Sequence, residues 1–297
     1  MDMSGFAAEM GSTGPVAVAG GRPDWEVGGS LEAGTRVLAA PAGVVDHEAS
    51  EMTVRVGAGT TVEELDAELA GAGQCVALPS AAGATVGGVL AVGRSGTRRL
   101  GWGPIRDVVL QVRYVSAEGN VITAGGPMIK NVSGFDLCRL LVGSLGTLGL
   151  IGEVILRTRP VPEAERWMTG PVEPEIALAQ LSSAVTVFWD GRTTWVRLSG
   201  LDADVSAQAR TAWSLGLEPA TAGPTRPSGG RWSLPPADLA ALPQRHPRMR
   251  FLAEMGVGIV HAVAPPPRRP VSPRVAGLHR RLKAEFDPDG RLSPGRD

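Results

Sequence analysis

The sequence predicts an α+β protein of about two domains, and three observations support this. The chain has 297 residues, about twice the roughly 150 that guide a one-domain estimate. Alternating or continuous apolar segments typical of strands occur between segments with helical spacing. Near Val161 glycine becomes rarer and proline-rich connectors begin. Hydrophobic residues make up 43% and charged residues 20% of the chain, which is enough for a sizeable core.

The first domain should combine strands, one well-defined helix and a hairpin. Residues 15–19, 36–41 and 52–59 have strand character. A helix should begin at Thr61, because Glu64 three residues later completes a capping box, and it should end at Gly71. Residues 107–126 alternate as a β-hairpin whose tip is 118–120.

The second domain should pair two strands, 182–190 and 193–200, and follow them with a helix ended by Gly216. A further strand is expected within 257–265. The proline-rich segment 264–273 reads as a linker, and an amphipathic helix followed by a turn should close the chain.

Charge and cysteine usage exclude several classes. With 29 basic and 30 acidic residues the net charge is −1, so no basic surface for nucleic acid is expected. The longest apolar region, 140–156, is short, glycine-rich and charged at Glu153, which excludes a membrane span. The N-terminus lacks the apolar run of a signal peptide. Cys75 and Cys138 read as two buried thiols in a reduced cytosol, and we expect a cytoplasmic protein.

Several local motifs of catalysis are missing. The sequence contains neither a P-loop nor a GxSxG elbow. Its histidines, 47, 246, 261 and 279, never pair at helical or strand spacing, so no metal site is expected. Gly57 and Gly59 precede a helix as in a dinucleotide fingerprint, but Val62 stands where the third glycine should be. A turn plus the Thr61 cap explains them better.

What remains is a set of glycine-rich, nearly uncharged loops that follow strands: 20–21, 84–96 and 143–151. Tight turns in a packed sheet are one explanation. The other is a diphosphate, because its charge can be held by backbone N–H groups where no Cβ blocks the approach. Three such loops in one chain favour a large phosphate-bearing ligand.

The residues at these loops resemble a known family. ATVGGVLAVGRSGTRRLGWGPIRDVV (residues 84–109), AEGNVITAGGPMIKNVSGFDLCRLLVGSLGTLGLIGEV (117–154) and the closing LKAEFDPDGRLSPGR (282–296) resemble the vanillyl-alcohol oxidase / p-cresol methylhydroxylase flavoprotein superfamily. Within it, the likeness is greatest to the FAD-binding second subunit of bacterial glycolate dehydrogenase (glycolate oxidase).

The resemblance implies a fold with FAD extended between two lobes. It places an FAD-binding domain at 1–160, with a small parallel lobe at about 1–77 and a mixed-sheet lobe at about 78–160. A smaller α+β cap domain would occupy 161–264. Residues 265–297 would form a linker and a helix that packs back on the FAD domain.

By position, the resemblance also implies a set of FAD-binding residues. They are Gly20, Gly21, Arg22, Pro79, Ala84, Thr85, Gly87, Gly88, Ser95, Gly96, Gly146, Gly149 and Ile151. Residues 130–140 would fold against the flavin lobe.

The sequence departs from the family pattern in several places. Gly93 replaces an asparagine, and the bulky Arg94 next to it could bind a phosphate or crowd the pocket. Gly101-Trp102, Pro104 and Phe135 are further departures. Only 14 residues precede Pro15, so most of the family's leading β-α piece is expected to be missing.

The implied function is that of an FAD-dependent oxidoreductase subunit in a glycolate-type 2-hydroxy-acid dehydrogenase complex. Its partners would be a catalytic flavoprotein subunit and an iron–sulfur subunit, through which the complex could lie at the inner face of the membrane. No catalytic residue is identified; Arg98, Arg99, Arg106 and Arg231 are the arginines available for a substrate carboxylate. Two alternatives stay open: a non-catalytic interaction subunit that binds FAD weakly or not at all, and a stand-alone oxidase of a sugar or sugar alcohol.

Overall fold

The computed structural model describes residues 2–21, 24–127, 136–267 and 271–296. It divides into two compact units. Unit 1 contains residues 1–96, 104–161 and 271–297, and unit 2 contains residues 97–103 and 162–270. The predicted division at 160 lies within two residues of this boundary, and the C-terminal helix belongs to unit 1.

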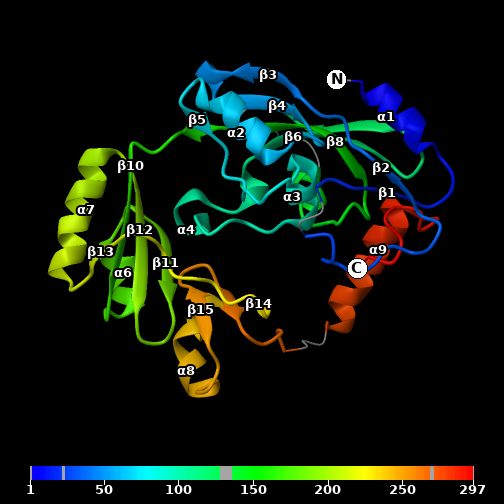
Figure 1. Ribbon diagram of the computed structural model, residues 1–297. Coiled ribbons are helices and arrows are strands. Elements are labelled where there is room, and N and C mark those ends of the chain that lie inside the picture. The colour runs from blue at the N-terminus through cyan, green and yellow to red at the C-terminus, as the bar shows by residue number, and fades with distance from the viewer. Residues whose placement is uncertain (1, 22–23, 128–135, 268–270, 297) are drawn as a thin grey trace. The chain divides into compact units, whose positions relative to one another are not determined.

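Unit 1 combines strands and helices (Figure 1). Its helices are α1 (Met3–Met10), α2 (Val62–Ala70), α3 (Val86–Val92), α5 (Leu137–Leu141) and α9 (Pro273–Phe286). Its strands are β1 (Val16–Val18), β2 (Arg36–Leu38), β3 (Val44–Glu48), β4 (Thr53–Gly57), β5 (Gln74–Cys75), β6 (Val109–Val115), β7 (Val121–Gly125), β8 (Leu150–Arg157) and β9 (Arg159–Pro160). The predicted helix at Thr61 and the predicted hairpin, now β6 and β7, are confirmed.

The main sheet of unit 1 has the strand order β3-β4-β8-β6-β7. All of its described ladders are antiparallel, so the expectation of a mixed sheet is wrong. The sheet also crosses the expected lobe boundary at 77/78, because β4, whose Val54 and Val56 are fully buried, pairs with β8. The parallel part of the small lobe is the two-stranded sheet β1-β2.

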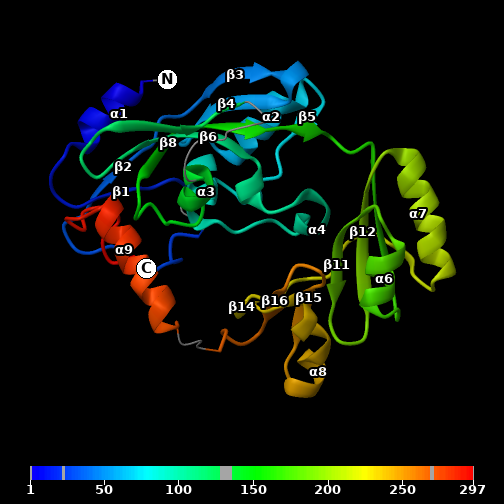
Figure 2. The same cartoon turned by 180° about the vertical axis from the view of Figure 1, so that it is seen from behind.

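The principal core of unit 1 lies between this sheet and helices α2 and α3. Leu65 and Leu69 of α2 and Leu90 of α3 are fully buried against Val54 and Val154. Figure 1 shows both helices on the same side of the sheet, and Figure 2 shows this from behind. This packing fixes α3, and therefore the loop that leads into it.

A second core in unit 1 brings the two ends of the chain together. Met3, Phe6 and Met10 of α1 are buried in a cluster that also contains Val16 and Leu292. The apolar side chains at positions 3, 6 and 10 follow a helical repeat, a signal that the sequence analysis did not use. The short N-terminal segment is thus a folded part of unit 1.

Unit 2 is built on one seven-stranded sheet with the order β13-β10-β12-β11-β15-β16-β14, antiparallel throughout its described ladders. Its strands are β10 (Ala164–Gly170), β11 (Ala184–Trp189), β12 (Thr194–Gly200), β13 (Glu218–Ala220), β14 (Gly230–Ser233), β15 (Phe251–Glu254) and β16 (Ile259–Ala262). Its helices are α4 (Arg99–Trp102), α6 (Pro174–Gln180), α7 (Asp202–Ser214) and α8 (Leu242–Arg245). The α+β class is confirmed in both units.

Residues 97–103, which we expected in the FAD domain, pack with unit 2 instead. A Cβ at Gly101 would lie 2.7 Å from Val185 Cγ1, so α4 approaches β11 closely. Thr186 Oγ1 donates a hydrogen bond of 2.9 Å to the Thr97 carbonyl oxygen. Arg98 forms a 3.0 Å ion pair with Glu165. These contacts place residues 97–103 in unit 2, although the loop that directly precedes them in the sequence belongs to unit 1.

Among the helices that the structure describes, none is both long and apolar enough to cross a membrane.

Candidate functional site

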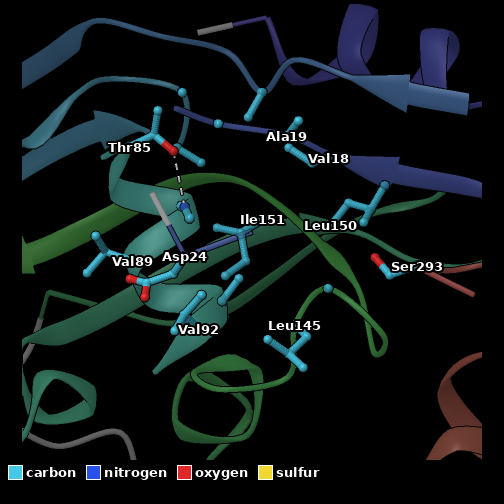
Figure 3. Close-up of a pocket in the computed structure, with 18 of the residues that line it drawn as sticks. Val18, Ala19, Asp24, Thr85, Val89, Val92, Leu145, Leu150, Ile151 and Ser293 are labelled. Carbon is cyan, nitrogen blue, oxygen red and sulfur yellow. Dashed lines mark hydrogen bonds between the residues drawn. The ribbon is translucent and has the colours of Figure 1, made fainter. Parts of the chain in front are cut away.

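A pocket in unit 1 collects most of the glycine-rich loops that the sequence singled out (Figure 3). One wall runs from Val18, the last residue of β1, to Ala19 and Gly20. A second wall is the start of α3, and a third runs from Leu145 into β8. In Figure 3, Thr85 and Ser293 lie on opposite sides of the space, with Ile151 between them.

Two of the loops touch each other through glycine. A Cβ at Gly20 would lie 2.0 Å from Thr85 Oγ1, and one at Gly21 would lie 1.6 Å from the Gly83 carbonyl oxygen. Real Cβ atoms do not approach other atoms this closely, so side chains are excluded at both positions. The absence of side chains here allows one loop to contact the other, and their contact forms a wall of the pocket.

Thr85 organises the loop that enters α3. Its hydroxyl oxygen accepts a 3.2 Å hydrogen bond from the Gly88 N–H and caps the helix. Gly87 donates its N–H to the Ala58 carbonyl oxygen at 2.7 Å, and a Cβ at Gly87 would lie 2.7 Å from Ala58 Cβ. The loop is therefore held rigidly against the end of β4.

Some backbone donors at the pocket remain available. Within the described residues, no hydrogen bond uses the N–H groups of Gly20, Gly21, Thr85 or Gly146, all of which line the pocket. Such donors around one cavity can bind an anionic group without a cationic side chain. This donor set fits a phosphate-bearing ligand.

The third wall begins in a left-handed turn. Leu145 has φ 55° and Gly146 has φ 74°, a region that a leucine rarely adopts. The Leu145 N–H donates to the Ala91 carbonyl oxygen at 2.9 Å, which ties this turn to α3. A Cβ at Gly149 would lie 2.4 Å from Tyr114 Cδ2, so packing alone excludes a side chain there.

Two charged side chains are found among the described lining residues, Asp24 and Arg296. Asp24 forms a 3.1 Å ion pair with Arg94, so Arg94 binds an acid in this structure. Arg296 donates to the Trp25 carbonyl oxygen at 2.8 Å, and its guanidinium lies 4.2 Å from the centre of the Trp25 ring. Burial lowers the pKa of Arg296, and nearby Glu26 opposes that effect.

The structure brings most of the predicted site residues together. The nine that line the pocket are Gly20, Gly21, Ala84, Thr85, Gly87, Gly88, Gly146, Gly149 and Ile151. Three do not line it: Pro79, Ser95 and Gly96. Ser95 Oγ instead accepts a 3.1 Å hydrogen bond from the Ile105 N–H, which joins the parts of unit 1 on either side of residues 97–103. Arg22 and most of the predicted segment 130–140, including Phe135, lie outside the described residues.

Several lining residues were not predicted, among them Asp24, Trp25, Leu145, Ser293 and Arg296. The last two belong to the closing motif that carried the resemblance, so a signal was present in the sequence. What the sequence lacked was the evidence that the C-terminal tail returns to β1.

The other candidate side chains lie elsewhere. None of the four arginines considered for a substrate carboxylate lines the pocket, namely Arg98, Arg99, Arg106 and Arg231. His47 hydrogen bonds to Gln74 at 3.0 Å, and His261 hydrogen bonds to the buried Glu254 at 2.7 Å. Across the described part of the chain, no group of three or more His, Cys, Asp or Glu side chains could hold a metal ion.

The two cysteines differ from each other. Cys138 is buried, and burial raises the pKa of its thiol to about 11. Cys75 is only partly buried, so the expectation of two buried thiols is wrong for it. The reason is its place in β5, a two-residue strand that pairs only with β9.

Part of unit 1 is similar to known proteins. Residues 7–125 match the model of the FAD binding domain family. The glycolate oxidase subunit GlcE of Escherichia coli is 31% identical over 176 residues, which cover 56% of this chain and 50% of that protein. The D-lactate dehydrogenase of Archaeoglobus fulgidus is 39% identical over 117 residues, 39% of this chain and 26% of that protein. The chain thus spans half or less of these relatives' lengths.

Solved structures give the same fold. The structure of an alkyldihydroxyacetonephosphate synthase superposes on this chain with a TM-score of 0.69 at 14% sequence identity. The superposed region covers 94% of this chain and 71% of the synthase. At that identity the likeness concerns the fold alone. The family match and the glycolate oxidase relative, in contrast, confirm the resemblance to FAD-dependent oxidoreductases, and FAD is the cofactor of this domain type.

Proposed function

We propose that the glycine-lined pocket of unit 1 is where this chain holds FAD, since residues 7–125 match the model of the FAD binding domain family. The observation that carries the proposal is the cluster of available N–H donors at Gly20, Gly21, Thr85 and Gly146 around a single cavity. The apolar remainder of the lining, including Val18, suits the uncharged parts of the cofactor.

We further propose that the chain is an oxidoreductase subunit in a glycolate-type 2-hydroxy-acid dehydrogenase complex. The E. coli relative is named a glycolate oxidase subunit, and the A. fulgidus relative is named a D-lactate dehydrogenase. Bound flavin would supply the redox chemistry, accepting electrons from a 2-hydroxy acid and passing them on. The catalytic flavoprotein and iron–sulfur subunits are the proposed partners, in the cytoplasm or at the inner face of the membrane through the complex.

The protein's own part in this proposal is binding and orientation. The Thr85 cap and the Gly87–Ala58 bond hold the α3 loop in one conformation before any ligand arrives. A preformed loop loses little conformational entropy on binding, which favours a tightly held cofactor. The ion pair of Arg94 with Asp24 neutralises the one described acid of the lining, which would otherwise repel a phosphate.

A specific observation supports the alternative of a non-catalytic interaction subunit. Gly20, Gly21 and Gly149 owe their missing side chains to contacts with other parts of the protein. A chain that had lost FAD would still need glycine at these positions to fold. Their presence is therefore weaker support for cofactor binding than the available N–H donors.

The test is to purify the chain alone and together with its complex. The proposal expects a yellow protein with the visible absorption bands of oxidised flavin, or uptake of added FAD with a stoichiometry of one. Anaerobic glycolate or D-lactate should bleach those bands in the complex, and co-purification should identify the partner subunits. A colourless chain that takes up no FAD, but that still assembles with partners, would support the interaction subunit instead.

A further inference from the structure

The C-terminal tail contributes a basic side chain to the pocket wall. Among the described lining residues Arg296 is the single basic side chain. Its Nε is buried and has no hydrogen-bond partner within the described residues, while Nη2 is used by the Trp25 carbonyl oxygen. A buried donor without a partner is costly, and an anionic ligand in the pocket would supply one.

The position of Arg296 follows from how the tail runs. Val16 donates to the Arg291 carbonyl oxygen at 2.9 Å, and the Ser293 N–H donates to the Val16 carbonyl oxygen at 2.8 Å. Leu292 thereby pairs with Val16 in parallel. This bridge joins the tail to β1 just before both segments reach the pocket, where Gly20 and Arg296 are both lining residues.

The tail is held firmly in this register. Arg291, which is 5% exposed, donates hydrogen bonds to carbonyl oxygens of five residues in the N-terminal loop and the β6–β7 turn. Asp287 accepts hydrogen bonds from the N–H groups of Arg291 and Leu292 at 3.0 and 2.8 Å. Lys283 forms a 2.5 Å ion pair with Asp287. These contacts hold the tail up to Leu292 against unit 1.

Charge balance points to the ligand group. Asp24 is neutralised by Arg94, so Arg296 leaves the described lining with a net positive charge beside available N–H donors. A diphosphate combines concentrated negative charge with acceptor oxygens that a guanidinium can bind with two N–H groups. The Trp25 ring beneath the guanidinium limits its rotation and keeps it oriented.

We propose that Arg296 binds the diphosphate of FAD, together with the N–H groups of the Gly20–Gly21 loop. This inference rests on the proposed function, because it assigns a role within the same pocket. It makes the C-terminal tail part of the cofactor site.

The test compares ligands with and without phosphate. Affinities for FAD, ADP and adenosine are measured by titration for the wild-type chain, Arg296→Gln and Arg296→Lys. Arg296→Gln should weaken the binding of FAD and of ADP by the same factor and leave the affinity for adenosine unchanged. The expected factor is roughly ten- to hundred-fold, as for the loss of a charge-assisted hydrogen bond. Arg296→Lys should recover part of the loss, because it keeps the charge but not the planar fork.

The matched control is Arg280→Gln, an exposed arginine on α9, which should change none of these affinities. Thermal unfolding of each variant without ligand verifies that the tail is still folded. Unchanged FAD and ADP binding in Arg296→Gln would overturn the inference, and so would an equal loss of adenosine. A wild-type chain that binds neither FAD nor ADP would contradict the proposed function itself.

Discussion

The two units bury their apolar side chains in different ways. In unit 2 the described core residues form one cluster that extends from Met168 in β10 to Val260 in β16. Unit 1 has two clusters, one beneath the main sheet and one that joins α1, β1 and the tail. The glycine-lined pocket touches both, through Ile151 of the first and Leu150 of the second.

The difference shows how a fold makes room for a ligand. Side chains that converge on one centre fill it to crystal-like density. Where two clusters stay separate, and glycine replaces side chains along their border, a space remains that backbone groups can line. If this comparison is right, adding one methyl group where the two clusters of unit 1 meet should have a larger free-energy effect than removing a charge from unit 2.

The largest effect is expected for Gly21→Ala. Its Cβ would lie 1.6 Å from the Gly83 carbonyl oxygen, which is backbone and cannot rotate away, so the two loops must separate. We expect roughly a hundred-fold loss of FAD affinity, because strain of a few kcal/mol opposes the bound conformation. Titration of the purified chain with FAD measures it. Gly126→Ala is the control, since a Cβ there meets no described atom within 4 Å; equal affinities for both variants would refute the border contact.

A substantial loss of stability is expected for Arg291→Met. The substitution removes the guanidinium that donates hydrogen bonds to five backbone carbonyl oxygens. These acceptors, which would stay at the same place in the fold, belong to Met10, Gly11, Thr13, Gly14 and Ala117. Leaving buried acceptors unpaired should lower the free energy of unfolding by about 3 kcal/mol. Urea unfolding followed by far-UV circular dichroism measures it, with the exposed Arg281→Met as control. A change as small as that of the control would mean that the second cluster alone holds the tail.

The smallest effect is expected for Glu165→Gln in unit 2. Burial acts to raise the pKa of the Glu165 carboxyl, but the hydrogen bond from Arg197 and the charges of Arg98 and Arg197 outweigh burial and lower it. The ionised form therefore stabilises the fold at neutral pH, and this contribution disappears as the pH falls through the lowered pKa. The variant should lose about 1 kcal/mol at neutral pH and progressively less in acid.

Tryptophan fluorescence suits this measurement, because six of the seven tryptophans lie in unit 2. Glu218→Gln on the exposed strand β13 provides the control. A difference between wild type and Glu165→Gln that stays constant with pH would show that ionisation of Glu165 does not stabilise the fold.

Local signals in the sequence were sufficient for individual elements. The capping box of Thr61 and Glu64 and the β6–β7 hairpin formed as predicted, because each depends on residues only a few positions apart. The order of strands in the main sheet was not accessible in this way. Val56 and Val154 are paired across the main sheet although about a hundred residues separate them in the sequence, and apolar alternation does not say which strand a given strand will join.

The sequence by itself determined that glycine-rich turns follow strands in the first half of the chain and that these turns resemble those of a flavoprotein. Only the tertiary structure decided why each glycine is there and what completes the site. Gly20, Gly21 and Gly149 are required by neighbours distant in the chain, and Arg296 reaches the pocket because the tail pairs with β1. Such contacts depend on long-range packing, for which a linear pattern of residue types carries no distance information.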